Sequence, residues 1–366
     1  METHIYLEKL KNIHYKLLEY LECIDDSEEN FQNIINYFEK NKILGNRYEL
    51  KLFLHLFSKI ANNHNRQHRL FEKIEKILLF YKNQIKQSYS NFEIFDIFKG
   101  NKKIVLFLIN ENMIKIDEQI SSILLSSRYN YMKYSEYFYP ELKPFFPEDH
   151  TFSIDGIENF EEKRKIGEND SYVCFLIRND FIDEFITFVN RINLPLNSKI
   201  QKSIFETNKF LLANDPTLIE YAIFFGSIQI FQYLRLNSIK PNSYFWQYAI
   251  HGKNADLIHL LEEDQIKPAY DSYDVFYKES IKCHHNDITN YIQNNFNVKK
   301  DEEIKSYFFE SVSYCFRYYN YEFIPSGIDY QSLFYYACYY DYYNLVGLLL
   351  NSQKVELNRT TKDRNI

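Results

Sequence analysis

The fold is decided by the stretch TLIEYAIFFGSIQIFQYLRL, residues 217–236. Its first half places bulky apolar residues around the small residue Ala222 and ends at Gly226. Its second half carries two apolar pairs three residues apart, Ile230–Phe231 and Tyr233–Leu234. This spacing predicts two short antiparallel helices, because apolar residues three or four positions apart share one helix face. The small side chain of Ala222 would let the two helices approach closely.

Other parts of the chain repeat this pattern. The hexapeptides 217–222, 244–249 and 332–337 all end in Tyr-Ala and carry a bulky apolar residue three positions before the alanine. The two apolar pairs of the second helix then recur at the same distances from each alanine. Weaker copies can be placed with Ser280 and Ser311 in the alanine position. One helix pair cannot bury its own apolar surface, so we expect such units to stack into a solenoid.

The clear copies resemble the ankyrin repeat. Residues 217–222 match that family's Thr-Pro-Leu-His-x-Ala signature at the Thr, Leu and Ala positions, whereas Leu218 and Glu220 replace the proline and the histidine. Gly226 falls at the glycine that ends the family's first helix, while Gly252 lies one residue too early. In composition the chain is similar to the divergent ankyrin proteins expanded in protozoan parasites, which carry an N-terminal helical region of unknown function.

These patterns predict an all-α fold, in which an N-terminal helical region precedes an ankyrin-like helix-pair solenoid. No proline occurs before Pro140, and apolar residues recur at helical spacing, so residues 1–139 are expected to be helical, with a divergent repeat near 91–116. Three nearby prolines mark a break, and residues 140–170 are expected to form an irregular linker or insertion. Divergent repeats would fill residues 171–366, and they are clearest at 217–242, 244–268 and 331–358.

Charge and cysteine content narrow the class of protein. The chain has 366 residues, with 43 Lys+Arg against 50 Asp+Glu and a formal net charge of −7, which disfavours broad binding to nucleic acid. Its five cysteines are far apart and include no Cys-x-x-Cys pair, as expected of reduced thiols in an intracellular, cytoplasmic protein. The N-terminus lacks the features of a signal peptide, and no segment is apolar enough to insert into a membrane.

What the resemblance implies is non-catalytic binding of a protein partner on the concave face of the array. Carried onto this sequence, the exposed first-helix positions of that face are Tyr221, Phe225, Tyr248, Tyr336 and Tyr340. Tyrosine suits an interface because it offers a large apolar area with a polar tip, although 33 tyrosines in one chain can produce such a column through composition alone. The alternative function is an enzyme or a small-molecule-binding protein with its site in the N-terminal helical region.

Catalytic and metal-binding patterns are weaker. His64 and His68 would share a helix face, but the glutamate of the His-Glu-x-x-His zinc motif is absent. The run Cys283-His284-His285 points in different directions and has no second ligand pair at zinc-finger spacing. Glycine-rich phosphate loops and Gly-x-Ser-x-Gly are also absent from the sequence. We therefore expect no catalytic residue, no metal and no cofactor.

The end of the repeat region carries a separate expectation. Repeat arrays normally finish with a polar capping repeat, whereas the last clear repeat here ends near Leu350. Leu345 and Leu349 would then face a missing neighbour. Either residues 355–366 fold over them, or a partner or a second copy of the chain covers them, or the chain is a truncated form. We predict self-association through this uncapped C-terminal repeat.

Overall fold

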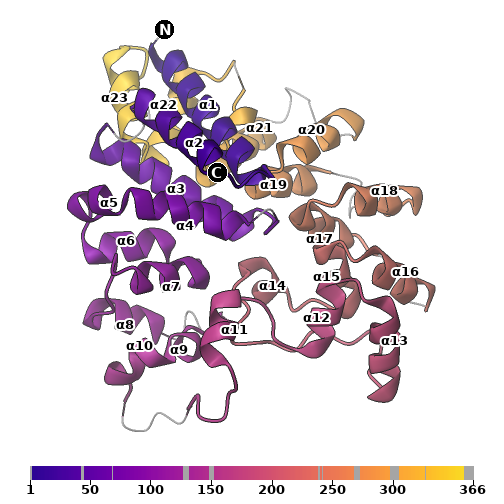
Figure 1. Cartoon of the computed structure of the whole chain (residues 1–366). Helices are drawn as coiled ribbons and strands as arrows, with labels where there is room; N and C mark the ends of the chain where they lie inside the picture. The colour runs from indigo at the N-terminus through magenta and orange to yellow at the C-terminus, as the bar shows by residue number, and fades with distance from the viewer. Residues whose placement is uncertain are drawn as a thin grey trace. The chain divides into compact units, whose positions relative to one another are not determined.

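The computed structural model describes residues 2–42, 45–67, 69–126, 132–147, 152–237, 240, 242–267, 273–296, 305–325 and 327–357, without the side chains of 305–310. Within these residues the chain is all-helical, and the only strand-like feature is an isolated bridge between Lys199 and Thr217 (Figure 1). The predicted all-α class is confirmed. No helix in this part of the chain combines the length and the apolarity that a membrane span requires.

The chain divides into two compact units. Unit 1 comprises Met1–Ile60, Arg66–Ile77 and Ser272–Ile366, and unit 2 comprises Ala61–Asn65 and Leu78–Asp271. Unit 1 is therefore built from both ends of the sequence, and unit 2 from its middle. The expected linker at residues 140–170 falls inside unit 2 and contains short helices.

Two helices of unit 1, α3 and α4, also contribute residues to unit 2. The helices of unit 1 are α1 Glu2–Glu22, α2 Glu28–Lys40, α3 Arg47–Asn63, α4 Leu70–Phe80, α19 Asp274–Cys283, α20 Asn286–Asn295, α21 Lys305–Tyr318, η4 Tyr321–Phe323, α22 Tyr330–Tyr339 and α23 Tyr343–Asn351. Those of unit 2 are α5 Lys82–Ser88, α6 Asn91–Phe98, α7 Lys102–Asn110, α8 Glu118–Leu124, α9 Tyr134–Tyr137, α10 Tyr139–Leu142, η2 Lys143–Phe145, α11 Phe160–Ile166, α12 Tyr172–Arg178, α13 Ile182–Arg191, α14 Lys209–Asn214, α15 Leu218–Phe225, α16 Ile228–Leu236, α17 Phe245–Gly252 and α18 Ala255–Glu263.

Among the residues that the structure describes, six helix pairs share one turn. A residue with positive φ follows the first helix of each pair, at Asp180, Gly226 and Lys253 in unit 2 and at His284, Tyr319 and Asp341 in unit 1. The residue after the positive-φ residue donates its backbone N–H to the carbonyl of the residue five positions before it in the sequence, at 2.8 to 3.2 Å. This hydrogen bond commonly ends a helix. We call the residues that accept these bonds the turn-acceptor residues: Leu176, Ala222, Ala249, Ser280, Cys315 and Ala337. All six are fully buried.

The predicted register of one weak copy is wrong. The sequence pattern placed Ser311 in the small position, whereas the turn-acceptor residue of that copy is Cys315. The second helix of the copy is shortened to the 3-10 turn η4. A buried cysteine packs as a small apolar residue, so a search for alanine or serine selects the serine one helical turn too early.

Successive pairs within a unit are joined by a second recurring bond. The Ser227 hydroxyl donates to the carbonyl of Ile177 in unit 2. In unit 1, Asn320 Nδ2 lies 3.0 Å from the Ile281 carbonyl oxygen, and the Tyr342 hydroxyl lies 2.8 Å from the Phe316 carbonyl oxygen. Each donor directly follows the positive-φ residue of its pair, and each acceptor directly follows the turn-acceptor residue of the pair before. Serine, asparagine and tyrosine thus make the same bond.

Gly252 lies where α15 and α17 approach each other. A Cβ at Gly252 would lie 2.4 Å from the carbonyl oxygen of Phe224, a distance that no side chain tolerates. The backbone of Gly252 does not have positive φ, and Lys253 takes the left-handed conformation instead. The glycine is needed for close packing, whereas Gly226 is the residue that ends a first helix.

The C-terminal repeat is covered, contrary to the sequence-based expectation. Leu345 and Leu349 are fully buried, and α1 packs against α23 and η4. Helix α1 also contacts the turn that ends α19 through a buried pair of imidazoles, in which His14 Nε2 lies 2.8 Å from His284 Nδ1. The prediction of a bare face is wrong because the amphipathic N-terminal helix supplies the missing neighbour. Residues 358–366, one of the predicted covers, lie outside the described residues.

Candidate functional site

The residues predicted to line a binding face come from first helices of the pairs. Tyr221 is only 1% exposed, and Tyr248 and Tyr336 are each 4% exposed. Phe225 and Tyr340 are half-buried. The expectation that these side chains are exposed is therefore wrong for the first three. Each of these tyrosines directly precedes a turn-acceptor residue, at a position that packs within its own unit.

Tyr221 belongs to a buried polar cluster in unit 2. Arg178 Nη1 donates to the Tyr221 hydroxyl and to the Asn169 carbonyl, both at 2.9 Å, and Arg178 Nε lies 2.8 Å from a Glu168 carboxylate oxygen. Burial raises the pKa of Tyr221 well above its usual range and raises the pKa of the nearby Cys174 thiol to about 11. A thiol that stays protonated at neutral pH is a poor nucleophile, so the cluster's geometry serves packing better than catalysis.

The cysteines divide by accessibility, and we expect their reactivity to follow. Cys174, Cys283 and Cys315 are fully buried, and burial raises the pKa of each thiol. At pH 8 a thiol reagent should modify the exposed Cys338 within minutes and the three buried thiols only after unfolding. Counting modified thiols in native and denatured protein, with Cys338→Ser as control, checks this. Fast modification of Cys174 in the folded chain would contradict it.

The raised pKa of Cys174 makes the free energy of unfolding depend on pH. The folded state favours the protonated thiol, so this contribution is fully present below the ordinary thiol pKa of 9.0 and is lost as pH rises through about 11.

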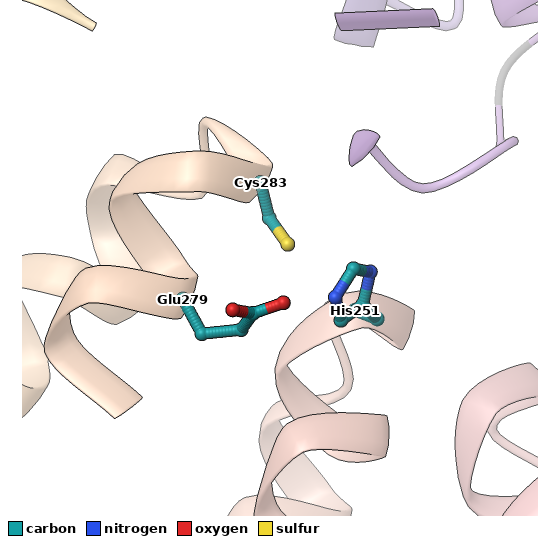
Figure 2. Close-up of side chains that lie close together, drawn as sticks. All are labelled: His251, Glu279 and Cys283. Carbon is teal, nitrogen blue, oxygen red and sulfur yellow. The ribbon is translucent and has the colours of Figure 1, made fainter. Parts of the chain in front are cut away.

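Residues of metal-ligating types are drawn in Figure 2. Glu279 and Cys283 lie one turn apart on α19, and His251 lies near the end of α17. His251 belongs to unit 2 and the other two to unit 1, so we assign no site to the three together. Within unit 1, Glu279 accepts a 2.6 Å hydrogen bond from Lys282, and burial raises the pKa of Cys283 well above its usual range.

The other sequence candidates for metal binding also have structural roles. His284 bonds to His14, and its positive φ makes it the residue that ends α19. His285 is fully buried and begins α20. His64 is buried, while His68 lies outside the described residues.

A cleft of about 730 Å³ lies within unit 2. Helices α5 to α7 and the extended residues 112–117 form one part of its lining, and Glu141 of α10 with Pro144 and Phe145 of η2 form the other. Its apolar lining includes Ile94, Ile109, Met113, Ile114, Ile116 and Phe145. The volume falls in the range of roughly 300–1,000 Å³ that is usual for small-molecule sites.

Polar side chains hold the extended wall of the cleft in place. Asn91 Oδ1 accepts the Lys115 N–H at 2.7 Å, and Asn91 Nδ2 donates to the Lys115 carbonyl at 2.8 Å and to Asp117 at 2.7 Å. Lys86 Nζ donates to the Asn112 carbonyl at 2.9 Å. The other Asp117 oxygen accepts the Ile120 N–H and caps α8. These bonds fix the backbone of residues 112–117.

The opposite side of the cleft is held by a buried ion pair. Arg164, only 3% exposed, donates a hydrogen bond to Glu141 from each of its two terminal nitrogens, at 2.7 and 2.8 Å. Arg164 also donates to the Tyr137 carbonyl at 3.2 Å. This bidentate ion pair engages both oxygens of the Glu141 carboxylate and fixes its orientation.

None of the cleft-lining residues is among the site residues predicted from the sequence. The one available signal is the non-helical run Ile114 to Asp117, which alternates apolar and charged residues between two helices. Comparison of the chain with protein-family models, with curated proteins and with solved structures finds no match to any of them.

Proposed function

We propose that this protein is a non-catalytic scaffold of ankyrin-like helix pairs that binds a protein partner. The proposal rests on the exposed aromatic rings of the last pair and of α3. Tyr339 is 68% exposed, Tyr343 is 59% exposed and Tyr48 is 42% exposed. Together with Tyr335 and Tyr340 these residues form what we call the tyrosine surface of unit 1. Of the five residues that the sequence predicts for a binding face, this surface includes only Tyr340.

The tyrosine surface is held in one arrangement. The rings of Tyr48 and Tyr343 stack with their centroids 3.8 Å apart, and the Tyr340 hydroxyl lies 2.6 Å from the Ser313 hydroxyl. Lys51 and Asp341 pair at 2.9 Å beside them. Rings that are already fixed lose little conformational entropy on binding, so this arrangement supports a binding role.

The recurring turn and the bond between successive pairs support the scaffold part of the proposal. They explain how divergent sequences keep one repeated geometry, since the turn needs only a buried acceptor carbonyl and one residue with positive φ. Repeat proteins with such units commonly use their extended surfaces for binding.

The test is capture of partners from native cell lysate with the full chain. We expect the Tyr339→Ser/Tyr343→Ser variant to lose a specific partner by roughly tenfold or more, because exposed aromatic anchors dominate such interfaces. The matched control is Tyr172→Ser/Tyr244→Ser, which removes two exposed tyrosines, 51% and 64% accessible, from unit 2. Equal capture by both variants, or no specific partner for the wild type, would refute the proposal.

A second function, small-molecule binding in the N-terminal helical region, is favoured by one observation. Most of the lining of the 730 Å³ cleft comes from residues 86–117, inside the region 1–139.

A further inference from the structure

The two lysines that line the cleft differ from its two carboxylates in how they are engaged within the protein. Both carboxylates are engaged within the protein, Asp117 by Asn91 and the α8 cap and Glu141 by Arg164. Lys86 donates to a neutral carbonyl, and neither it nor Lys115 pairs with a carboxylate among the described residues. Two exposed lysines therefore line an apolar cleft, and neither pairs with a carboxylate in the described part of the chain.

We propose that the cleft of unit 2 binds a small amphipathic carboxylate, with its head group at Lys86 and Lys115 and its apolar body on the isoleucine-rich lining. An apolar molecule would leave the two ammonium groups unused, and a cation would be repelled by them. The inference does not depend on the tyrosine surface, which lies in the other unit.

The apolar lining provides the affinity for the body of the ligand. Ile94, Met113 and Ile114 are 1%, 3% and 4% exposed, so they form a fixed floor, whereas Ile109 and Phe145 are half-buried and remain accessible. Each methylene group of a ligand that leaves water strengthens binding by about fourfold, the equivalent of the usual transfer free energy. A chain of several methylene groups fits within about 730 Å³.

The lysines provide discrimination between head groups. Because the wall is already held by Asn91, bringing a carboxylate to Lys86 and Lys115 requires little rearrangement of the backbone. Charge-assisted hydrogen bonds are roughly twice as strong as neutral ones, so a carboxylate is expected to bind on the order of tenfold or more tightly than the matching alcohol.

The experiment is calorimetric titration of the full chain with decanoate and with decanol, below the concentrations at which either aggregates. We expect decanoate to bind and decanol to bind at least about tenfold more weakly. In Lys86→Gln/Lys115→Gln this preference should disappear. The matched control, Lys240→Gln/Lys267→Gln, makes the same charge change outside the cleft and should keep the preference.

A third variant tests whether the two ligands bind in the cleft. Ile109→Trp fills part of the space and should abolish binding of both ligands, and Phe145→Trp serves if the first variant does not melt like the wild type. Three results would overturn the inference: no binding of decanoate by the wild type, equal affinity for acid and alcohol, or a preference that survives in Lys86→Gln/Lys115→Gln.

Discussion

Replacing Gly252 with alanine is expected to lower the free energy of unfolding of this protein by about 3 kcal/mol. The added Cβ would lie 2.4 Å from the Phe224 carbonyl oxygen and 3.3 Å from the Ile223 carbonyl oxygen, both of which are backbone atoms of α15. A flexible side chain could move aside, but these atoms move only if α15 and α17 separate. Separation would loosen the packing of Ala222 and Ala249, which are fully buried. Urea unfolding followed by circular dichroism measures the effect.

The matched control is Gly347→Ala. Gly347 lies within α23, and a Cβ there would meet no atom within 4 Å, so the change only raises helix propensity. We expect it to stabilise the protein by about 0.5–1 kcal/mol. Opposite signs for the two glycine-to-alanine changes would support the close approach of α15 and α17. A neutral Gly252→Ala variant would contradict it.

Replacing Arg164 with leucine is expected to lower the free energy of unfolding by about 3–5 kcal/mol, because it leaves a carboxylate partly buried without its partner. The side chain of Glu141 is 17% exposed and the side chain of Arg164 is 4% exposed, so water can replace little of the lost interaction. The Tyr137 carbonyl loses a donor as well. The same urea experiment measures the loss.

Two further variants separate the pairing of Arg164 from its packing. Glu161 also contacts Arg164, at 2.9 Å, but its side chain is 57% exposed, so Glu161→Gln should change stability by less than about 1 kcal/mol. The double variant Arg164→Leu/Glu141→Leu should recover much of the loss, since no unpaired charge remains. An Arg164→Leu variant that unfolds like the wild type would show that the ion pair is not needed. Freeing Glu141 should also weaken decanoate binding, because an unpaired carboxylate at the cleft repels an anion.

The sequence was informative where local pattern decides structure. Apolar spacing and the small residue Ala222 were enough to predict the helix pair at residues 217–236, since both depend on near neighbours along the chain. The packing partner of each helix face depends on distant residues. For that reason the sequence predicts an exposed Tyr221, which in the structure binds Arg178, and an uncovered Leu345, on whose helix α1 packs.

The cleft escaped prediction for the same reason. Its lining combines residues 86–117 with Glu141 and η2, and no sequence motif connects these residues with Arg164, which pairs with Glu141. The register error at Ser311 has a different cause, because serine and cysteine can both occupy a small buried position. Only the backbone bond to the Cys315 carbonyl distinguishes them.

The assembly of unit 1 from both ends of the sequence has a consequence for synthesis on the ribosome. Helix α1 is translated before unit 2, but much of what it packs on, namely η4 and α23, is encoded after residue 272. Residues 78–271 are translated in between, which takes on the order of 10–40 s at about 5–20 residues per second. During that delay the apolar stripe of α1 has only its early neighbours to cover it. The nascent chain is therefore a natural client for chaperones that shield apolar helices, and unit 2 has the opportunity to fold first.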